Sequence, residues 1–116
     1  MSITRSRFEE LVADAIDGLP AWVVDAMDNV EVLVEDAPPP GQPGLLGLYH
    51  GIPLSRRGAG YTNVLPDTIT LYRATIMRVA GTDERRVQRQ VARTVAHEVA
   101  HHFGISDERL LEIDAY

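Results

Sequence analysis

The sequence predicts a small α+β domain, because helical and strand patterns occupy different parts of the chain. Apolar residues recur at three- and four-residue spacing near the N-terminus and again over residues 82–103, which is typical of helices with one buried face. Between them lie three short stretches with the composition of strands. At 116 residues the chain can bury one hydrophobic core, so we expect a single domain over residues 1–116.

The first helix is expected near the N-terminus, with this apolar face: Phe8, Leu11, Val12, Ala15, Ile16 and Leu19. Ser6 and Glu9 match a capping box at its start, whereas Gly18 and Pro20 are typical of its end. Pro20 could also be the first residue of a second, short helix through Ala26.

The middle of the chain is expected to form these three strands: residues 30–35, 45–54 and 68–72. Residues 37–44 contain four prolines and two glycines and should form an exposed loop. Residues 55–67 should form a longer, glycine-containing loop of the kind that often borders a site. A short helix is expected over residues 74–80, ending at Gly81.

The last long helix should run from residue 82 or 83 to Phe103, followed by Gly104 as a left-handed C-terminal residue. Its apolar stripe should lie on the sheet and has these members: Val87, Val91, Val95, Val99, Ala92, Ala96 and Phe103. A rotation of about 100° per residue places His97 and His101 on the side away from the valines. His102 points nearer the valines and is interpreted as structural or as orienting a ligand.

His97 and His101 are four residues apart, so their rings can converge on one metal ion. Glu98 points elsewhere around the helix and is better placed as a general base beside the ion than as a ligand. After the chain reverses at Gly104, Asp107 can supply a third ligand, which completes the pattern HExxHxxGxxD. Three protein ligands and an open fourth position are what a catalytic zinc site requires.

Each of these assignments has a structural alternative. His97 and His101 could be solvated residues on a polar helix face. Asp107 could instead stabilise the first turn of a final helix capped by Ser106 and running to residue 116, in which case the third ligand would be one of two other carboxylates, Glu108 or Glu112.

Other polar residues are expected to be structural. His50 is read as a core or edge histidine of a strand, and Arg56 and Arg57 as loop charges. Tyr72 and Arg73 could line a cleft or stabilise an oxyanion, with a structural role at least equally supported.

Composition limits the possible partners and ligands. The formal net charge is −6, from 17 acidic and 11 basic residues, so we expect neither nucleic acid nor a membrane as a partner. Because the chain has no cysteine, a metal must be held by imidazole and carboxylate. The sequence has no signal-peptide pattern and no stretch long enough to span a bilayer, and we expect a cytoplasmic protein.

The stretch HEVAHHFGISDERL, together with LPDTITLYRATI, resembles the small bacterial zincin-like metallopeptidases, or minimal metalloproteases. The resemblance extends from about Gly47 to Leu111. It implies a zincin-like fold in which a small mixed sheet of three to four strands packs on the N-terminal helix and the motif helix. It also implies a zinc ion held by His97, His101 and Asp107, with Glu98 as the base.

The motif also resembles the metzincin pattern HExxHxxGxxH, but no methionine follows Asp107, and Met77 lies upstream. The leading hypothesis is a zinc-dependent metallopeptidase-type hydrolase acting on a peptide or protein substrate, which would lie along a strand edge such as residues 68–72. The alternatives are a zinc-binding interaction domain with little catalysis and a zinc-dependent ribonuclease, against which the acidic charge and Glu98 argue. Oligomeric state and the choice among zinc, iron, cobalt and manganese stay open.

Overall fold

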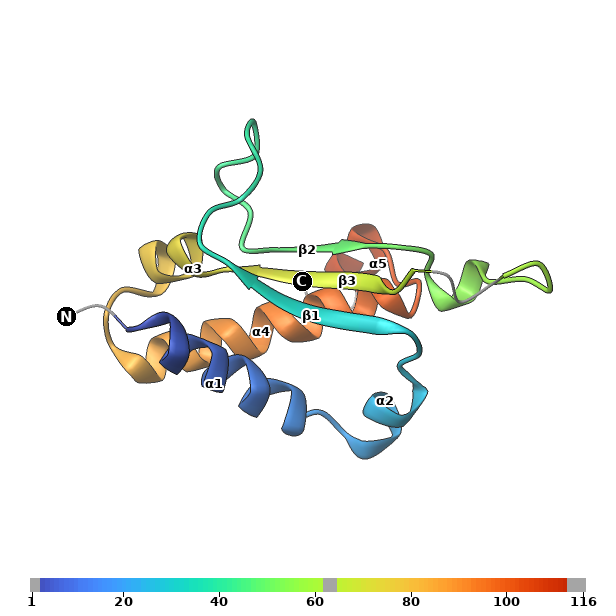
Figure 1. The fold of residues 1–116 in the computed structure, drawn as a ribbon, viewed down its shortest axis with the longest axis horizontal. Coiled ribbons are helices and arrows are strands. Elements are labelled where there is room, and N and C mark those ends of the chain that lie inside the picture. The colour runs from blue at the N-terminus through green and yellow to red at the C-terminus, as the bar shows by residue number, and fades with distance from the viewer. Residues whose placement is uncertain (1–2, 62–64, 113–116) are drawn as a thin grey trace.

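A computed structural model describes residues 3–61 and 65–112 of the chain, without the side chain of Leu111. Figure 1 shows these elements: α1 (Arg5–Asp17), α2 (Ala21–Ala26), β1 (Val30–Glu35), β2 (Gly47–His50), the 3-10 helix η1 (Leu54–Arg56), β3 (Asp67–Tyr72), α3 (Arg73–Ala80), α4 (Glu84–His102) and α5 (Asp107–Glu112). Residues 62–64 of the predicted long loop and residues 113–116 of the predicted final helix lie outside the described residues.

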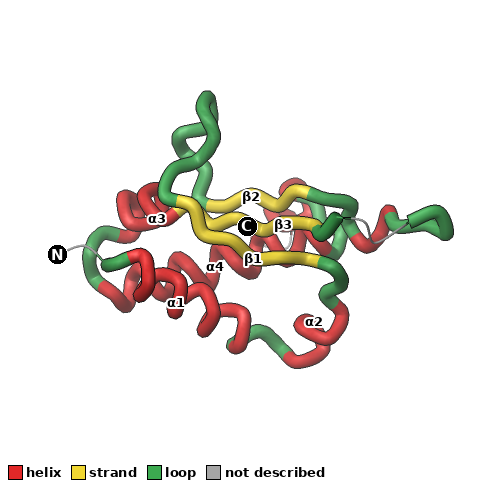
Figure 2. Tube along the Cα trace, in the orientation of Figure 1, coloured by secondary structure: helices red, strands yellow, loops and turns green. Residues whose placement is uncertain are grey.

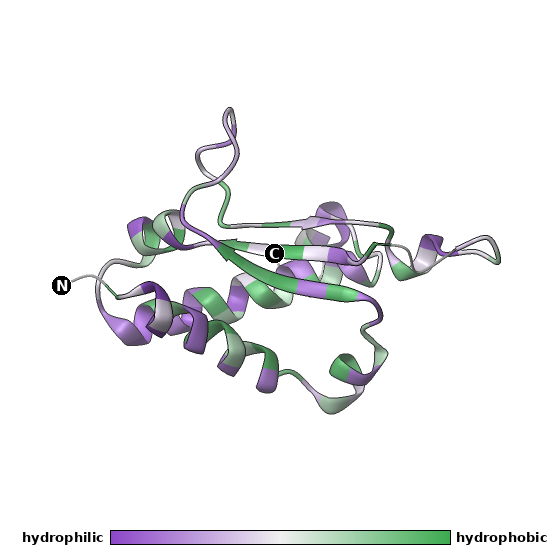
Figure 3. Cartoon of the chain, in the orientation of Figure 1, coloured by the Kyte–Doolittle hydropathy of each residue, from purple (hydrophilic) through white to green (hydrophobic). Residues whose placement is uncertain are grey.

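The three strands form one mixed sheet in the order β1-β3-β2. β1 runs parallel to β3, with Val32 opposite Ile69, and β2 runs antiparallel to β3, with Tyr49 opposite the same residue. β1 alternates as predicted, and Figure 3 shows hydrophobic and hydrophilic bands along it. The structure confirms the expected α+β fold with a small mixed sheet. β3 is the central strand, so β2 and β1 are the edges.

One hydrophobic core joins the helices to the sheet. α4 packs against β2, β3, α1 and α3, and Figure 1 shows it running alongside α1 beneath the sheet. The core includes Phe8 and Leu11 from α1 and Ile69 and Leu71 from β3, all almost fully buried. From α4 come the four valines spaced four residues apart, Val87, Val91, Val95 and Val99.

The predicted stripe on α4 is partly wrong, because Ala92 and Ala96 are both exposed. The buried face of α4 instead includes the valines and three polar residues on the flank opposite the alanines: Thr94, Glu98 and His102. These three residues lie within a narrow sector of the helix together with the valines, as the rotation of about 100° per residue requires. One consequence is that a glutamate of the motif points into the protein.

Among the element boundaries that differ from the prediction, two have a clear local cause. α1 is capped by Thr4, whose side-chain oxygen accepts a hydrogen bond from the backbone amide of Arg7, so the helix begins earlier than a Ser6 cap would allow. β2 ends at His50, because the backbone leaves the ladder at Gly51 and Pro53 has no amide to donate.

Two connections extend from the sheet, one between β1 and β2 and one after β2, as Figure 2 shows. The first holds the proline-rich segment and is tied back by Arg78, which donates a hydrogen bond to the carbonyl oxygen of Pro43. The second includes η1. Within the described ranges, none of the helices has the length and apolar character needed to cross a bilayer.

Candidate metal centre

The two motif histidines of α4 lie one helical turn apart, with their rings in an edge-to-face arrangement. Their Nε2 atoms lie 3.1 Å from each other, and the ring centroids are 4.8 Å apart. Both side chains are about one-fifth exposed, at 17% for His97 and 22% for His101. They are therefore shielded on most sides and open on one, as a reactive site requires.

Asp107 joins the histidines through the turn that ends α4. Gly104 has a φ of 93°, a left-handed conformation that favours glycine, and the amide of Ile105 bonds back to the carbonyl of Ala100. This reversal brings Asp107 Oδ1 to 3.1 Å from His97 Nε2 and 2.9 Å from His101 Nε2. The three atoms form a nearly equilateral triangle.

The alternatives for Asp107 can be compared with this geometry. Ser106 does cap α5, since its hydroxyl accepts a hydrogen bond from the amide of Arg109 at 3.1 Å. Capping of α5 therefore does not prevent Asp107 from approaching the two histidines. Ser106 forms the cap, and the Asp107 carboxylate faces the two imidazole rings. Glu112 instead pairs with Arg109 at 3.1 Å, and Glu108 is exposed.

The donor atoms suit a divalent metal. The backbone carbonyl of Ile105 lies 2.8 Å from His101 Nδ1, so a proton on that nitrogen leaves the Nε2 lone pair directed at the triangle. Burial, and secondarily the nearby His101, lowers the pKa of His97, which favours the neutral imidazole that a metal needs. Two imidazoles and one carboxylate are a ligand set that zinc accepts.

Glu98 lies beside the triangle but comes from the buried face of α4. It is 6% exposed. One carboxylate oxygen of Glu98 and one ring nitrogen each of His97 and His101 lie within 4.8 Å of one another. Burial is the main reason that the pKa of Glu98 is raised, while the nearby His101 and a hydrogen bond from the Tyr49 backbone oppose this shift. A carboxyl group with a raised pKa next to a metal site is suited to proton transfer.

The triangle opens into a cleft beside the edge strand β2. The cleft has a volume of about 430 Å³ and is lined by Leu48 and Tyr49 of β2, by Arg56 of η1 and by the motif residues of α4 and α5. A peptide could therefore reach Glu98 and the triangle from the side of β2.

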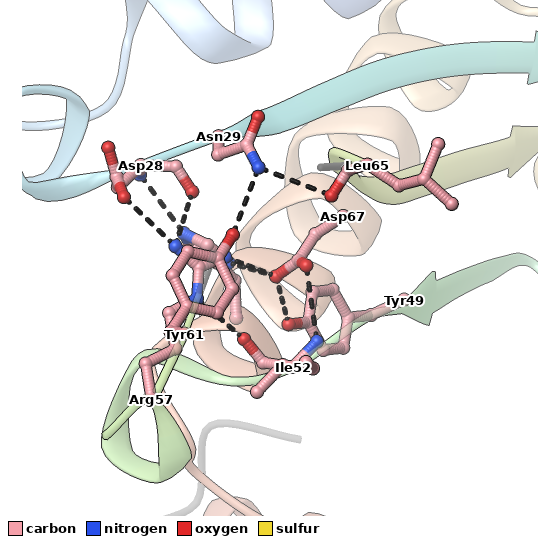
Figure 4. A network of polar contacts seen from close by, with 9 residues as sticks. Asp28, Asn29, Tyr49, Ile52, Arg57, Tyr61, Leu65 and Asp67 are labelled. Carbon is pink, nitrogen blue, oxygen red and sulfur yellow. Dashed lines mark hydrogen bonds and ion pairs between the residues drawn. The ribbon is translucent and has the colours of Figure 1, made fainter. Parts of the chain in front are cut away.

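A buried polar network contacts the C-terminal end of α4 through His102. Figure 4 shows most of its members. The Asp67 carboxylate accepts hydrogen bonds from the Tyr49 hydroxyl, from the Ile52 amide at 3.1 Å and from Arg57 at 2.8 Å. It also lies 3.1 Å from Nδ1 of His102, whose Nε2 is 3.2 Å from the amide of Asp28. His102 is fully buried, so the structure supports the structural interpretation of this histidine.

The electrostatics of this network favour an ionised Asp67 and a neutral His102. Burial alone would raise the pKa of Asp67, but its hydrogen bonds from Tyr49, Ile52 and Arg57 lower that pKa overall. Burial lowers the pKa of His102 in spite of the neighbouring carboxylate. Because His102 follows His101, and because Tyr49 provides the backbone contact to Glu98, the network connects to both sides of the site.

The prediction that Arg57 is a loop charge is wrong. Its side chain is 7% exposed, forms ion pairs with Asp67 and Asp28, and stacks over the ring of Tyr61 at 4.3 Å. Asp67 was not predicted as a site-supporting residue. The sequence does contain a signal for this role, because Asp67 directly precedes the predicted strand over residues 68–72. An aspartate at the end of a buried strand needs hydrogen-bond partners for its carboxylate.

The remaining predicted positions are structural or peripheral. Tyr72 is 4% exposed, and Arg73 donates to the carbonyl oxygen of Ile3 and pairs with Asp36 at 3.6 Å, so neither lines the cleft. His50 is exposed at the end of edge strand β2. Arg56 does line the cleft.

Comparison with known sequences places the motif in a family. Residues 27–116 match the sequence model of the zincin-like metallopeptidases. The chain belongs to this family. The match covers all three strands, α4 and α5, and leaves out α1 and α2. No protein with a curated functional description matches the chain significantly.

A solved structure shares the fold of this zincin-like domain. The domain is similar to a conserved hypothetical protein from Thermus thermophilus, with 30% sequence identity and a TM-score of 0.61. The similarity covers 87% of this chain and 94% of that protein. The match to the family model over residues 27–116 confirms the family resemblance of the sequence motifs.

Proposed function

We propose that this zincin-like domain is a zinc-dependent hydrolase of peptide bonds, with His97, His101 and Asp107 as the metal ligands and Glu98 as the general base. The observation that carries the proposal is the convergence of two imidazole nitrogens and one carboxylate oxygen within about 3.1 Å of one another. Family membership supports the same chemistry. A zinc ion held by these side chains would supply Lewis acidity toward the scissile carbonyl group and the attacking water.

Glu98 carries out the proton transfers in this proposal. Its carboxylate accepts a proton from the attacking water and later gives a proton to the leaving nitrogen, so that the carbon–nitrogen bond breaks without expelling an amide anion. Burial of Glu98 keeps its carboxyl group close to the reacting atoms and raises its pKa, which makes it a stronger base than an exposed glutamate. The hydrogen bond from the Tyr49 backbone fixes its direction.

The peptide is proposed to bind along β2, since the predicted docking edge at residues 68–72 is wrong. Those residues belong to β3, which pairs with β1 on one side and β2 on the other and has no free edge. β2 is an edge strand and lines the cleft at the motif helix, so an extended peptide can pair with its outer backbone groups other than the Tyr49 group that bonds to Glu98.

Substituting Glu98→Gln in the zinc-loaded protein tests the assignment of the base. The variant should retain zinc and lose peptide cleavage by about a hundredfold or more, the usual contribution of a general base. Cleavage of a peptide library and metal content would be measured on the same samples. Parent-like cleavage by the variant would contradict the proposal, and zinc binding by a parent that cuts no peptide would favour a zinc-binding interaction domain.

A further inference from the structure

A groove lies between α1 and β1, at the edge of the sheet opposite the proposed metal centre. Its volume is about 610 Å³, and residues of these two elements line it. In the sheet order β1-β3-β2, β1 is the second edge strand, and Figure 1 shows it on the side of β3 away from β2. The groove shares no lining residue with the cleft beside β2. The family model begins at residue 27, so the α1 wall lies outside the region that defines the family.

The backbone of β1 directs hydrogen-bonding groups toward this free edge. The amide of Asp67 bonds to the carbonyl of Asn29, and in a parallel pair alternate residues of a strand bond to the same neighbour. The intervening residues, which include Val32 and Val34, therefore turn their amides and carbonyls away from β3. Arg5 of α1 donates a hydrogen bond to the Val34 carbonyl, which agrees with this direction. The outward amide and carbonyl of Val32 are left for an added strand.

The groove combines an apolar floor with an acidic rim. The floor consists of buried and half-buried side chains from both elements: Val12, Ile16, Val32 and Val34. The charged lining residues are three acids and one arginine: Glu9, Asp17, Glu35 and Arg5. Arg5 already bonds to Val34 and pairs with Asp36 at 3.9 Å, whereas the ion pairs seen among the described residues include none of these three acids. The rim therefore carries negative charge that a basic ligand would neutralise.

We propose that an extended basic segment of a partner protein binds this groove as a fourth strand beside β1. In strand addition, backbone hydrogen bonds provide affinity and alternate side chains provide specificity. Residues of the added strand opposite Val32 and Val34 would face the apolar floor, because cross-strand neighbours share one face of a sheet. Residues opposite Glu31 and Glu35 would lie on the outer face, where lysine or arginine can pair with these exposed acids. The segment is therefore apolar at its centre and basic at both ends.

A second copy of this chain is the alternative occupant, and charge disfavours it. Pairing of two β1 edges would bring the acidic rims of both copies together, in a chain with a formal net charge of −6. Like charges opposite each other destabilise a strand pair. A basic segment uses the same backbone groups and the same apolar floor without this repulsion. The inference goes beyond the proposed hydrolysis and does not depend on it.

Peptide binding to the Glu98→Gln variant, which lacks the proposed base, tests the proposal without turnover. The probe is a fluorescein-labelled, end-blocked peptide with the core Lys-Val-Leu-Val-Lys, whose symmetric order suits both directions of strand pairing. One control core has Glu in place of both lysines. The other is Lys-Pro-Pro-Pro-Lys, which keeps the charge but has no amide donor between the lysines. By fluorescence anisotropy, we expect the probe to bind about tenfold tighter than either control.

Paired substitutions on α1 in the same background assign binding to the groove. The double variant Glu9→Gln/Asp17→Asn removes two rim acids and should weaken probe binding about three- to tenfold. Glu10→Gln/Asp14→Asn is the matched control, because these two acids of α1 are exposed but do not line the groove. It makes the same change in net charge and should weaken binding less than about twofold at physiological salt, where charges are screened beyond about 8 Å.

Val32→Pro tests the strand pairing itself. An edge strand tolerates proline where the amide faces away from the sheet, so this variant should fold and lose only the outward donor of β1. Probe binding should weaken about tenfold, and clearly less in Val32→Ala, which retains the amide. Circular dichroism verifies the fold, and the α1 variants decide the question if Val32→Pro does not fold.

Three results would each overturn the proposal: equal binding of the Lys and Glu cores, equal effects of the two α1 double variants, or parent-like binding by folded Val32→Pro. Sedimentation of the protein without peptide tests the alternative occupant. A dimer that Val32→Pro disrupts would assign the groove to a second copy and contradict the basic partner. A monomer that binds the Lys probe with the expected preferences would support the partner segment.

Discussion

Asp67 and Arg57 form a buried ion pair that contributes to stability only while both partners are present. Their side chains are 4% and 7% exposed, and the Asp67 carboxylate has further hydrogen bonds from Tyr49 and Ile52. Removing one charge of a buried pair leaves the other without compensation, which costs more than the pair contributes. The sequence did not predict this pair, because the two residues are ten positions apart across an irregular loop and no periodicity relates them.

Arg57→Met should lower the free energy of unfolding by about 3 kcal/mol, since it leaves the Asp67 carboxylate buried and short of a cation. Arg56→Met is the matched control, because Arg56 is the neighbouring arginine and is exposed. That control should change stability by less than about 0.5 kcal/mol. Urea unfolding of both variants gives the comparison, and equal losses would show that the buried pair has no special role.

The lowered pKa of Asp67 also predicts how stability depends on pH. Its folded pKa lies below that of an unfolded aspartate, about 3.9, so between these two values the unfolded state binds more protons and stability falls as the pH falls. The stabilisation is therefore fully present above about pH 4 and is lost as the pH falls through the folded pKa. Asp67→Asn should show a flatter loss of stability between about pH 5 and 2 in urea titrations, and a slope as steep as the parent's would refute this origin.

The turn between α4 and α5 brings Asp107 to the two histidines, and it depends on Gly104. Gly104 combines a φ of 93° with close packing, because a Cβ atom there would overlap Oγ of Ser55 in η1. Gly81 has a similar φ of 83°, but its Cβ position has no heavy atom within 4 Å. Alanine substitutions at the two glycines therefore distinguish the cost of backbone strain from the cost of steric overlap.

Gly81→Ala should destabilise the protein by about 1–3 kcal/mol through backbone strain alone, because a φ of 83° with a ψ of −157° is almost exclusive to glycine. In Gly104→Ala, the movement of Ser55 or of the turn should add a further cost of about 1–3 kcal/mol to the strain of a positive φ. Gly104→Ala should also weaken zinc binding, since the turn sets the position of Asp107. Thermal unfolding and zinc titration of both variants test this, and zinc affinity unchanged in Gly104→Ala would show that the turn does not position the third ligand.

The helix α4 shows what periodicity could and could not predict. Its valine stripe and the proximity of His97 and His101 follow from spacing alone, and its C-terminal end follows from Gly104. Spacing did not reveal which flank of the stripe is buried, since alanines on one side look more apolar than Thr94, Glu98 and His102 on the other. Tertiary contacts decide this point, because the Tyr49 backbone of β2 is a partner for Glu98 and the Asp67 carboxylate is a partner for His102.

At the scale of the whole molecule, the fold was predictable from local patterns plus a family motif, but the strand order was not. β1 and β3 lie at almost the predicted positions and β2 is shorter than predicted. β3 is central because it pairs with β1 in parallel and with β2 in antiparallel orientation. This arrangement leaves β2 as the edge beside the proposed metal centre. The docking edge was mispredicted because strand order depends on contacts distant in sequence.

Zinc should stabilise the folded protein as a whole, because the three proposed ligands converge only after α4, the Gly104 turn and α5 have formed. Free zinc at about a hundred times its dissociation constant would add about 2.7 kcal/mol. That corresponds to an increase in Tm on the order of 10 °C for a domain of this size. Melting curves with zinc and with a chelator measure the shift, and the His101→Ala variant should show none.

Metal content is the most direct test of the proposed three-ligand centre. It would be measured on protein purified without a histidine tag, for the parent and for His97→Ala and Asp107→Ala. We predict about one zinc ion per chain in the parent and its loss from both variants, as expected for a site with three protein ligands. Zinc retained in Asp107→Ala would contradict the assignment of Asp107, and a parent without metal under zinc-replete conditions would contradict the metal centre itself.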